Sequence, residues 1–213
     1  MRWFAIETSS PCVSLALGQD DLVLREVSRN GNASTLVEPL FRELNVDLDQ
    51  IDQCVIGQGP GSYNGLRLGY AFLKGLLCLQ PLPVVEIPSP LTLAQIALEK
   101  LGKPEATLLI LNNARRNEIY GALVDGRSGS PHLCWQTVCD EPTLLAKLPE
   151  QLDAVVAYDY TAGDFPALAG RTWISICPTA TTAGQLAQRL KQPSAADLSQ
   201  LEPHYVRAPV PGV

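Results

Sequence analysis

Short apolar runs separated by turn residues open the chain and predict three β-strands. These runs are WFAI at residues 3–6, CVSLAL at 12–17 and LVLREV at 22–27. Apolar residues then recur at helical spacing from Thr35 to Leu44, and the run CVIG at 54–57 predicts a fourth strand. A second helix is predicted over 62–79, with Ser62 as its N-cap. The first part of the chain therefore has the predicted element order βββαβα.

The same order of elements returns in the second part of the chain. Strands are predicted at 107–113, 118–125 and 132–138, followed by a helix at 141–148, strands at 153–159 and near 171–176, and a helix at 182–190. A helix over 89–101 joins the two parts. Three strands followed by alternating helices and strands are typical of a mixed sheet covered by helices, so we expect an α/β fold made twice. The predicted domains are 1–101 and 102–213, the second with an extended Pro-rich tail.

Composition and charge narrow the class of protein. The chain has 213 residues, of which 46% are hydrophobic and 18% charged, so it is long enough to build real cores. The N-terminus reaches Glu7 after four apolar residues, too short a run for a signal peptide, and we expect a cytoplasmic protein without a membrane span. A net charge of −6 argues against this chain holding a polyanion by itself. If the protein acts on RNA, a partner must therefore supply the basic residues that bind the RNA phosphates.

The usual signatures of catalysis are missing from the sequence. The glycine-rich stretch lacks both the G-x-G-x-x-G spacing and the P-loop pattern, and no G-x-S-x-G motif surrounds Ser62. Only two histidines occur, His132 and His204, and neither has a second histidine at metal-binding spacing. We therefore expect neither a catalytic residue nor a metal ion.

The stretch GQGPGSYNGLRLGYAFLKGL at 57–76 has more glycine than a packed helix needs. At about 100° per residue, two apolar faces result, one with Gly65, Gly69, Phe72 and Leu76 and the other with Leu66, Tyr70, Leu73 and Leu77. Only the strip with Arg67 and Lys74 is polar, so we expect a helix covered on two sides. Each internal glycine costs about 1 kcal/mol relative to alanine, which predicts a close approach of another backbone at Gly65 and Gly69.

The helix predicted over 35–44 is the nearest candidate to cover that face, either within one chain or across an interface. Its apolar stripe includes Leu36, Leu40 and Phe41. We predict a partner-binding surface on the two helices, made of Leu36, Leu40, Phe41, Gly65, Gly69, Phe72 and Leu76. The alternative is that these helices pack only on each other and on the cleft between the two halves.

Several motifs resemble one family. GPGSYNGLRLG is similar to the G-P-G-S-[FY]-T-G-L-R-[IL]-G signature of TsaB (YeaZ-like) proteins, and AIETSSPCVSLAL, NNARRNEIYGAL and PHYVRAP resemble further blocks of that family in the expected order. The resemblance runs from residue 4 to residue 209 and so covers essentially the whole chain. It implies relatedness to TsaD and an actin-like (ribonuclease H-like) duplicated βββαβα fold.

The resemblance also implies a role. TsaB-like proteins are noncatalytic subunits that bind TsaD, which transfers a threonylcarbamoyl group to N6 of the adenosine next to the anticodon in tRNAs reading codons that begin with A. The ATPase TsaE joins the assembly, and tRNA is expected to contact mainly TsaD. The two opening helices of TsaB bind TsaD, or a second TsaB when TsaD is absent, so we expect a homodimer of the isolated chain.

Departures from the family pattern bear on nucleotide chemistry. Glu7 and Asn113 stand where the family commonly has Asp, and Asn64 replaces Thr. The loss of Asp at position 113 leaves fewer carboxylates to hold a metal. We therefore expect no ATP hydrolysis by this chain alone, and at most weak ATP or ADP contacts at the complex interface. The residues expected to make them are Thr8, Ser9, Ser10 and Gly61.

The resemblance implies that the motif NNARRNEIY lies near the cleft between the two halves. There, Arg116 is expected to hold a carboxylate, with Glu118 close by; a solvated charged turn is the alternative. Two other functions stay open. An independent small-molecule kinase or ATPase on this fold predicts nucleotide turnover by the isolated protein, and a hydrolase predicts dependence on His132 or His204.

Overall fold

The chain divides into two compact units. The computed structural model describes residues 1–126, 130–190, 194–195 and 198–204. The first unit contains Met1–Thr92 and Pro178–His204, and the second contains Leu93–Cys177. The predicted Pro-rich tail, at residues 205–213, lies outside the described residues.

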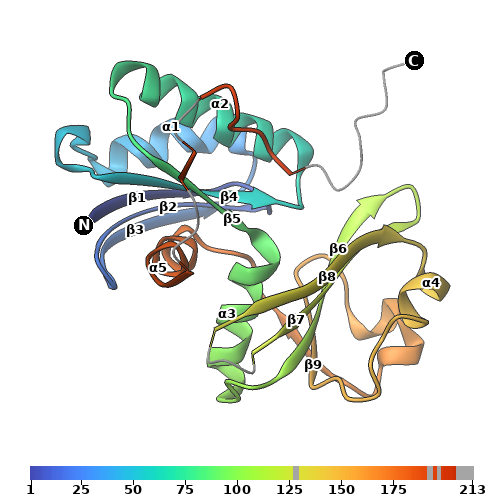
Figure 1. The fold of residues 1–213 in the computed structure, drawn as a ribbon. Helices are drawn as coiled ribbons and strands as arrows, with labels where there is room; N and C mark the ends of the chain where they lie inside the picture. The colour runs from blue at the N-terminus through green and yellow to red at the C-terminus, as the bar shows by residue number, and fades with distance from the viewer. Residues whose placement is uncertain (127–129, 191–193, 196–197, 205–213) are drawn as a thin grey trace. The chain divides into compact units, whose positions relative to one another are not determined.

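The first unit is built on a six-stranded mixed sheet with the order β11-β5-β4-β1-β2-β3 (Figure 1). Strands β1 to β3 form an antiparallel meander, and β4 and β5 continue the sheet on the other side of β1, parallel to it. The strands are β1 (Arg2–Glu7), β2 (Cys12–Gln19), β3 (Leu22–Asn30), β4 (Gln53–Gly59), β5 (Val84–Pro88) and β11 (Ser194–Ala195).

Helices cover both faces of this sheet. The helices α1 (Ala33–Leu44) and α2 (Tyr63–Leu79) lie on one face and α5 (Ala180–Leu190) lies on the other (Figure 1). Helix α1 begins earlier than predicted because Asn32 caps it, accepting a hydrogen bond at Oδ1 from the backbone N–H of Ser34 at 3.0 Å. Ser62 caps α2, as predicted. The core between this sheet face and α1 and α2 includes Phe4, Ile6, Leu15, Leu40, Ile56, Leu73 and Leu77.

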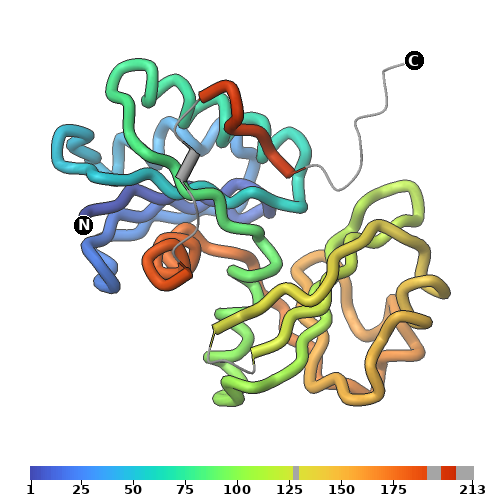
Figure 2. The backbone as a smooth tube through the Cα atoms, viewed as in Figure 1, coloured from blue at the N-terminus to red at the C-terminus, as the bar shows by residue number. Residues whose placement is uncertain are grey.

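The C-terminal part of the chain returns to the first unit, which corrects the predicted division into 1–101 and 102–213. Helix α5 packs directly on Trp3, because Gly184 has no side chain to collide with the indole ring. The backbone N–H of Ala180 donates to Ser14 Oγ at 2.7 Å, which fixes the start of the helix against β2. Residues 198–204 also pack on the first unit (Figure 2), and Leu201 is buried in its core. Tertiary contacts therefore place α5 where chain order does not.

The second unit repeats the plan of the first. Its five-stranded sheet has the order β10-β9-β6-β7-β8, with an antiparallel meander from β6 to β8 and with β9 and β10 parallel to β6. Helix α3 (Ser89–Leu101) leads from the first unit into the second. The remaining elements are β6 (Thr107–Arg115), β7 (Glu118–Asp125), β8 (His132–Cys139), α4 (Glu141–Leu145), β9 (Ala154–Ala157) and β10 (Thr172–Ser175).

The two sheets share one strand order, so the predicted duplication is confirmed. In each, the first strand lies between its antiparallel neighbour and the parallel fourth strand. The sequence did not predict β5, because its run VVEIP is short and lies among prolines. The second unit also replaces one crossover helix with the short 3₁₀ turns η2 (Ala162–Asp164) and η3 (Pro166–Leu168) between β9 and β10.

Candidate functional site

The loop that follows β1 is closed by hydrogen bonds from its own chain. Glu7, Thr8, Ser9 and Ser10 are all buried. The backbone N–H of Ser9 donates to Glu7 Oε1 at 2.7 Å, and Ser89 Oγ lies 3.0 Å from Ser9 Oγ as its donor. The backbone N–H of Ser62 donates to the carbonyl oxygen of Ser9 at 2.6 Å. The loop is thereby tied to the start of α2 and the start of α3.

Glu7 is a buried carboxyl group at the carboxyl end of β1. Burial raises its pKa, and hydrogen bonds from Ser9, Thr8 and Ser89 act in the opposite direction. Its carboxyl group fits against β4 because Gly57 has no Cβ, which would overlap both carboxyl oxygens. Within the described part of the chain, no group of three or more His, Cys, Asp and Glu residues is placed to hold a metal ion.

The residues expected to contact a nucleotide are enclosed. The side chains of Thr8, Ser9 and Ser10 are buried, and a Cβ at Gly61 would overlap the carbonyl oxygen of Ser9. A phosphate group would have to displace these intrachain contacts to reach the hydroxyl groups. Nucleotide binding at this loop stays a prediction of the family resemblance.

Gly65 and Gly69 face the interior of their own unit, which corrects their assignment to a partner interface. A Cβ at Gly65 would overlap the carbonyl oxygen of Thr8, and a Cβ at Gly69 would overlap Thr8 Oγ1. Both glycines are buried. The close approach that the glycines predict is real, but the approaching backbone is the loop after β1 and not another helix.

The side of α2 opposite Leu66, Leu73 and Leu77 is exposed, and it is apolar except for Asn64 in the first turn. Leu68, Ala71, Gly75 and Leu79 lie within a stripe roughly 80° wide at about 100° per residue. Leu68 is half-buried, Ala71 and Gly75 are exposed, and Leu79 is 82% exposed. A Cβ added at Gly75 would meet no atom within 4 Å. Sequence reasoning missed this stripe, although the signal was present in a helix with apolar residues nearly all round.

The other residues predicted to bind a partner have mixed outcomes. Leu40 lies on the inner side of α1 and is fully buried. Its side chain is part of the core, which corrects its assignment to the partner-binding surface. Phe41 and Phe72 are half-buried, and their rings meet edge to face with centroids 5.2 Å apart, which joins α1 to α2. Leu36 and Leu76 are also half-buried. For these four side chains, contact with a partner stays a prediction.

The turn between β6 and β7 is a charged, exposed tip. Arg115, Arg116 and Asn117 adopt left-handed backbone conformations with φ of 66°, 56° and 61°. Arg116 is exposed and, among the residues the structure describes, forms no ion pair with a carboxylate, so the expected anchoring contact is not present. Nearby, Asp159 accepts a hydrogen bond from the backbone N–H of Asn113 at 2.9 Å, and burial raises its pKa. Glu118 is half-buried at the start of β7, and a place for it in a cleft stays a prediction.

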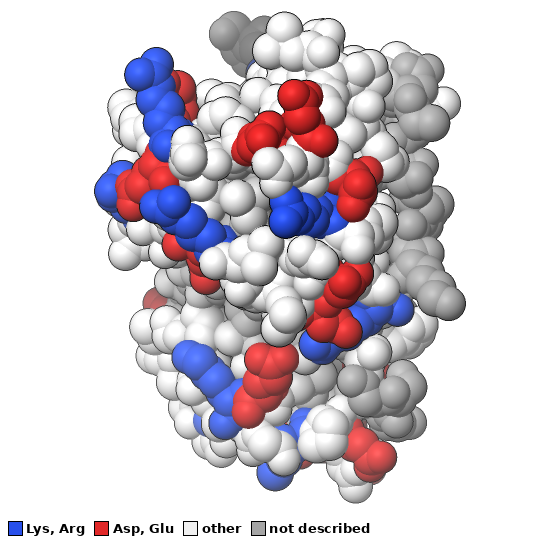
Figure 3. Space-filling view, turned by 90° about the vertical axis from the view of Figure 1, so that its left-hand side faces the viewer, with Lys and Arg blue, Asp and Glu red and all other residues white. Residues whose placement is uncertain are grey.

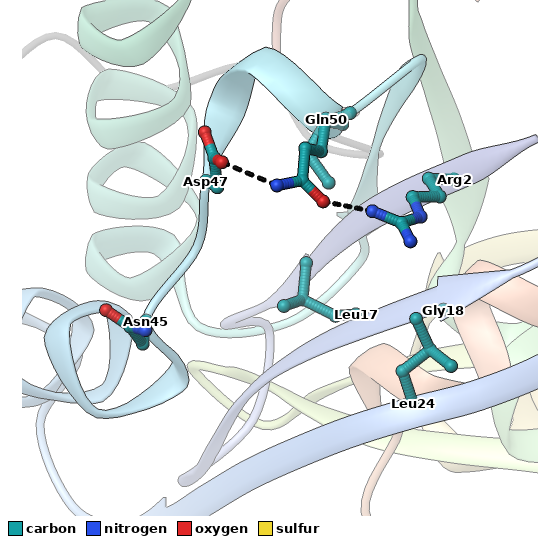
Figure 4. Close-up of a pocket in the computed structure, with 8 residues that line it drawn as sticks. Arg2, Leu17, Gly18, Leu24, Asn45, Asp47 and Gln50 are labelled. Atoms are coloured by element: carbon teal, nitrogen blue, oxygen red, sulfur yellow. Dashed lines mark hydrogen bonds between the residues drawn. The ribbon is translucent and has the colours of Figure 1, made fainter.

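A pocket of about 340 Å³ lies at the other end of β1 from Glu7 (Figure 4). Gln50 links its two charged residues: its Nε2 donates to Asp47 Oδ2 at 2.7 Å, and its Oε1 accepts from the Arg2 guanidinium. Its remaining lining residues are Leu17, Gly18, Leu24, Asn45 and Ile51. The second unit holds another pocket of about 420 Å³ at the carboxyl ends of β9 and β10, lined by Tyr158, Asp159, Tyr160, Thr161, Ala162, Trp173, Ile174 and Ser175.

Charge is mixed over the face drawn in Figure 3. Basic and acidic side chains alternate there, and neither sign forms a continuous patch. No helix among the described residues is long and apolar enough to cross a membrane.

Comparison with known proteins gives consistent relatives. The family model of TsaD, the tRNA N6-adenosine threonylcarbamoyltransferase, matches residues 28–128. The chain is 26% identical to the tRNA threonylcarbamoyladenosine biosynthesis protein TsaB of Bacillus subtilis, over 97% of this chain and 94% of the relative. It is 30% identical to the protein of the same name from Escherichia coli, over 57% of this chain and 54% of that protein.

Solved structures agree on the fold. YeaZ from Pseudomonas aeruginosa superposes with a TM-score of 0.79 at 20% identity, over 95% of this chain and all (100%) of that chain. The ethanolamine utilization protein EutJ from Carboxydothermus hydrogenoformans has a TM-score of 0.50 at 10% identity, over 87% and 89% of the two chains. The duplicated sheets therefore form the expected actin-like fold. Together with the motifs at residues 4–209, these comparisons show that the chain is similar to TsaB (YeaZ-like) proteins in sequence and in fold.

Proposed function

We propose that this chain is a noncatalytic subunit in threonylcarbamoyladenosine biosynthesis, which binds a TsaD-like transferase through the exposed apolar stripe of α2 and the adjoining side of α1. The stripe consists of Leu68, Ala71, Gly75 and Leu79. The observation that carries the proposal is that α2 exposes apolar residues on the face turned away from its own sheet, from Leu68 to Leu79, with Asn64 as the polar residue at its start. In the proposed assembly, tRNA is held mainly by TsaD, TsaE supplies the ATPase, and any weak ATP or ADP contact lies at the interface.

Exposed apolar surface is the first support. A helix that lies on its own sheet normally presents a polar outer face, and contiguous apolar patches on a soluble protein mark interaction sites. Leu79 is 82% exposed, and Ala71 and Gly75 are exposed on the same stripe. Burial of such side chains against a partner removes apolar area from water and favours association.

Gly75 is the second support. A glycine inside a helix costs about 1 kcal/mol relative to alanine. The close contacts with Thr8 explain why residues 65 and 69 are glycines, because a Cβ at Gly65 or Gly69 would overlap Thr8. No atom of the described residues approaches the position of a Cβ at Gly75 in this way. A partner helix whose backbone comes close at this position would account for the glycine.

The enclosed strand-end loop supports a noncatalytic role. The carboxyl group of Glu7 is buried against Gly57, and the hydroxyl groups of Thr8 and Ser9 are buried with it. A catalytic carboxylate must reach its substrate within hydrogen-bond distance, which this packing prevents. His132 and His204 are both exposed. The chemistry is therefore assigned to the partner.

The test compares two exposed leucines of the same unit. Leu79→Glu places a charge on the stripe, and Leu22→Glu makes the same change on β3, where Leu22 is 70% exposed. We expect Leu79→Glu to weaken binding to TsaD by at least about tenfold, close to 1.4 kcal/mol, and to abolish threonylcarbamoyl transfer in a reconstituted mixture. Leu22→Glu is expected to change neither, and both variants should melt like the wild type.

Binding is measured by titration calorimetry and folding by thermal melting. Normal TsaD binding by a folded Leu79→Glu variant would remove the stripe from the proposal. ATP turnover by the isolated, contaminant-free chain would support the kinase or ATPase alternative instead. Hydrolase activity lost on changing His132 or His204 would support the other alternative.

A further inference from the structure

The charges on α2 are all of one sign. Arg67 and Lys74 are the only charged residues between Tyr63 and Leu79, although the chain as a whole carries a net charge of −6. At about 100° per residue the two side chains fall on one strip, which borders the exposed stripe of Leu68, Ala71, Gly75 and Leu79. The proposed interface is therefore apolar with a basic margin.

Arg67 is held in place by an aromatic neighbour one turn earlier. Its Nη1 donates to the hydroxyl group of Tyr63 at 3.0 Å, and its guanidinium carbon lies 5.3 Å from the centroid of the Tyr63 ring. Arg67 is exposed, and Tyr63 is 45% exposed. The pairing restricts the guanidinium and leaves further N–H donors for another acceptor. Tyrosine and arginine are also the residue types that dominate binding energy at protein interfaces.

No carboxylate among the described residues forms an ion pair with Arg67. Lys74 has an acidic neighbour in Glu86: it lowers the Glu86 pKa, against the burial that raises it. Arg67 is exposed, is held in place by Tyr63 and has no ion-pair partner among the described residues, so it is available to an anion outside this chain.

A second copy of this chain is a poor source of that anion. Helix α2 has no carboxylate, and the carboxylates of α1 are already paired. Glu38 forms an ion pair with Arg42 on the same helix, and Glu43 pairs with Arg29 at 2.6 Å. Docking two copies through this surface would bring basic margins together or require these pairs to break.

We infer that Arg67, positioned by Tyr63, is a docking point for a carboxylate of the protein partner, and that it favours an acidic-margined partner over a second copy of this chain. The inference rests on the proposed function and adds the chemistry of the partner: an apolar helix bordered by Asp or Glu. A guanidinium binds a carboxylate through paired, charge-assisted hydrogen bonds, which select geometry as well as charge.

The experiment measures the affinity for TsaD at two salt concentrations. Arg67→Glu is compared with Arg25→Glu, which makes the same charge change at an exposed position of β3. At about 0.1 M salt we expect Arg67→Glu to weaken binding at least tenfold and Arg25→Glu less than twofold. At about 1 M salt the difference should shrink, because exposed charges are then screened within roughly 3 Å.

Two conservative variants separate geometry from charge. Arg67→Lys keeps the charge and loses the planar fork, so we expect only partial recovery relative to Arg67→Glu. Tyr63→Phe keeps the ring and removes the hydroxyl group that accepts from Arg67, and a loss of about threefold is expected. Arg67→Gln replaces Arg67→Glu if the charge reversal fails to fold, with the same expected direction.

The outcomes distinguish this inference from the proposed function. If Leu79→Glu abolishes TsaD binding while Arg67→Glu binds normally, the carboxylate contact is refuted and the stripe stands. If neither variant changes binding, both fail. Self-association, measured by sedimentation, should not weaken in Arg67→Glu; weakening equal to that for TsaD would overturn the selection against a second copy.

Discussion

The two faces of α2 have similar composition and different surroundings. The inner face packs Leu66, Leu73 and Leu77 into the core, and its glycines, Gly65 and Gly69, make room for Thr8. The outer face also combines leucine, alanine and glycine, yet Leu79 and Gly75 meet no part of the described chain that would cover them. A glycine in a helix therefore marks a close approach, but only its surroundings tell whether the neighbour belongs to the same molecule.

The largest effect is expected from Gly65→Ala on the inner face. The new Cβ would overlap the carbonyl oxygen of Thr8, which is backbone and has no rotamer to yield. We expect the free energy of unfolding to fall by about 1–3 kcal/mol, measured by urea denaturation. An unchanged midpoint would show that the loop after β1 moves away easily, and the distinction between the two faces would lose its basis.

Gly75→Ala is the matched change on the outer face, with the opposite sign. Its Cβ enters open space, so the helix gains up to about 1 kcal/mol from the better propensity of alanine. The same methyl group should weaken TsaD binding if a partner backbone comes close there. Denaturation and calorimetry on this one variant check both effects, and a variant that is more stable and also binds better would place Gly75 outside the close contact.

A smaller effect is expected beneath the inner face, at Glu7, because hydrogen bonds from Ser9, Thr8 and Ser89 offset part of the cost of burial. A raised pKa in the folded state means that the protonated form is favoured there. The stability linked to this proton is complete below the ordinary value of 4.5 and is lost as the pH rises through the folded-state pKa. Glu7→Gln does not titrate, so its stability relative to the wild type should rise with pH above 4.5.

Urea denaturation across a pH series measures this difference. The exposed Glu105→Gln variant is the control for replacing a carboxylate by an amide. A stability difference for Glu7→Gln that falls as the pH rises would contradict the enclosed position of the carboxyl group against Gly57.

Local sequence pattern determined most of the element order. Alternating and helical periodicities located the meander of each unit, the helices α1, α2 and α3, and the order βββαβα that both sheets follow. The motifs around residues 57–69 and 113–120 led to the family directly. Strand β5 was not predicted, because a five-residue strand bordered by prolines carries little periodic signal.

Contacts between distant residues decided the rest. Periodicity predicted two apolar faces on α2, and both turn inward: Gly65 and Gly69 pack on Thr8, and Leu66 and Leu73 lie in the core. The exposed stripe with Gly75 belongs to neither predicted face, so only the packing shows which glycine is free for a partner. In the same way, the fit of Gly184 on Trp3 brought α5 back to the first sheet, against the order of the chain. A sequence fixes which residues share a face of an element, because backbone geometry is local. What lies opposite that face depends on long-range packing, which only the tertiary structure decides.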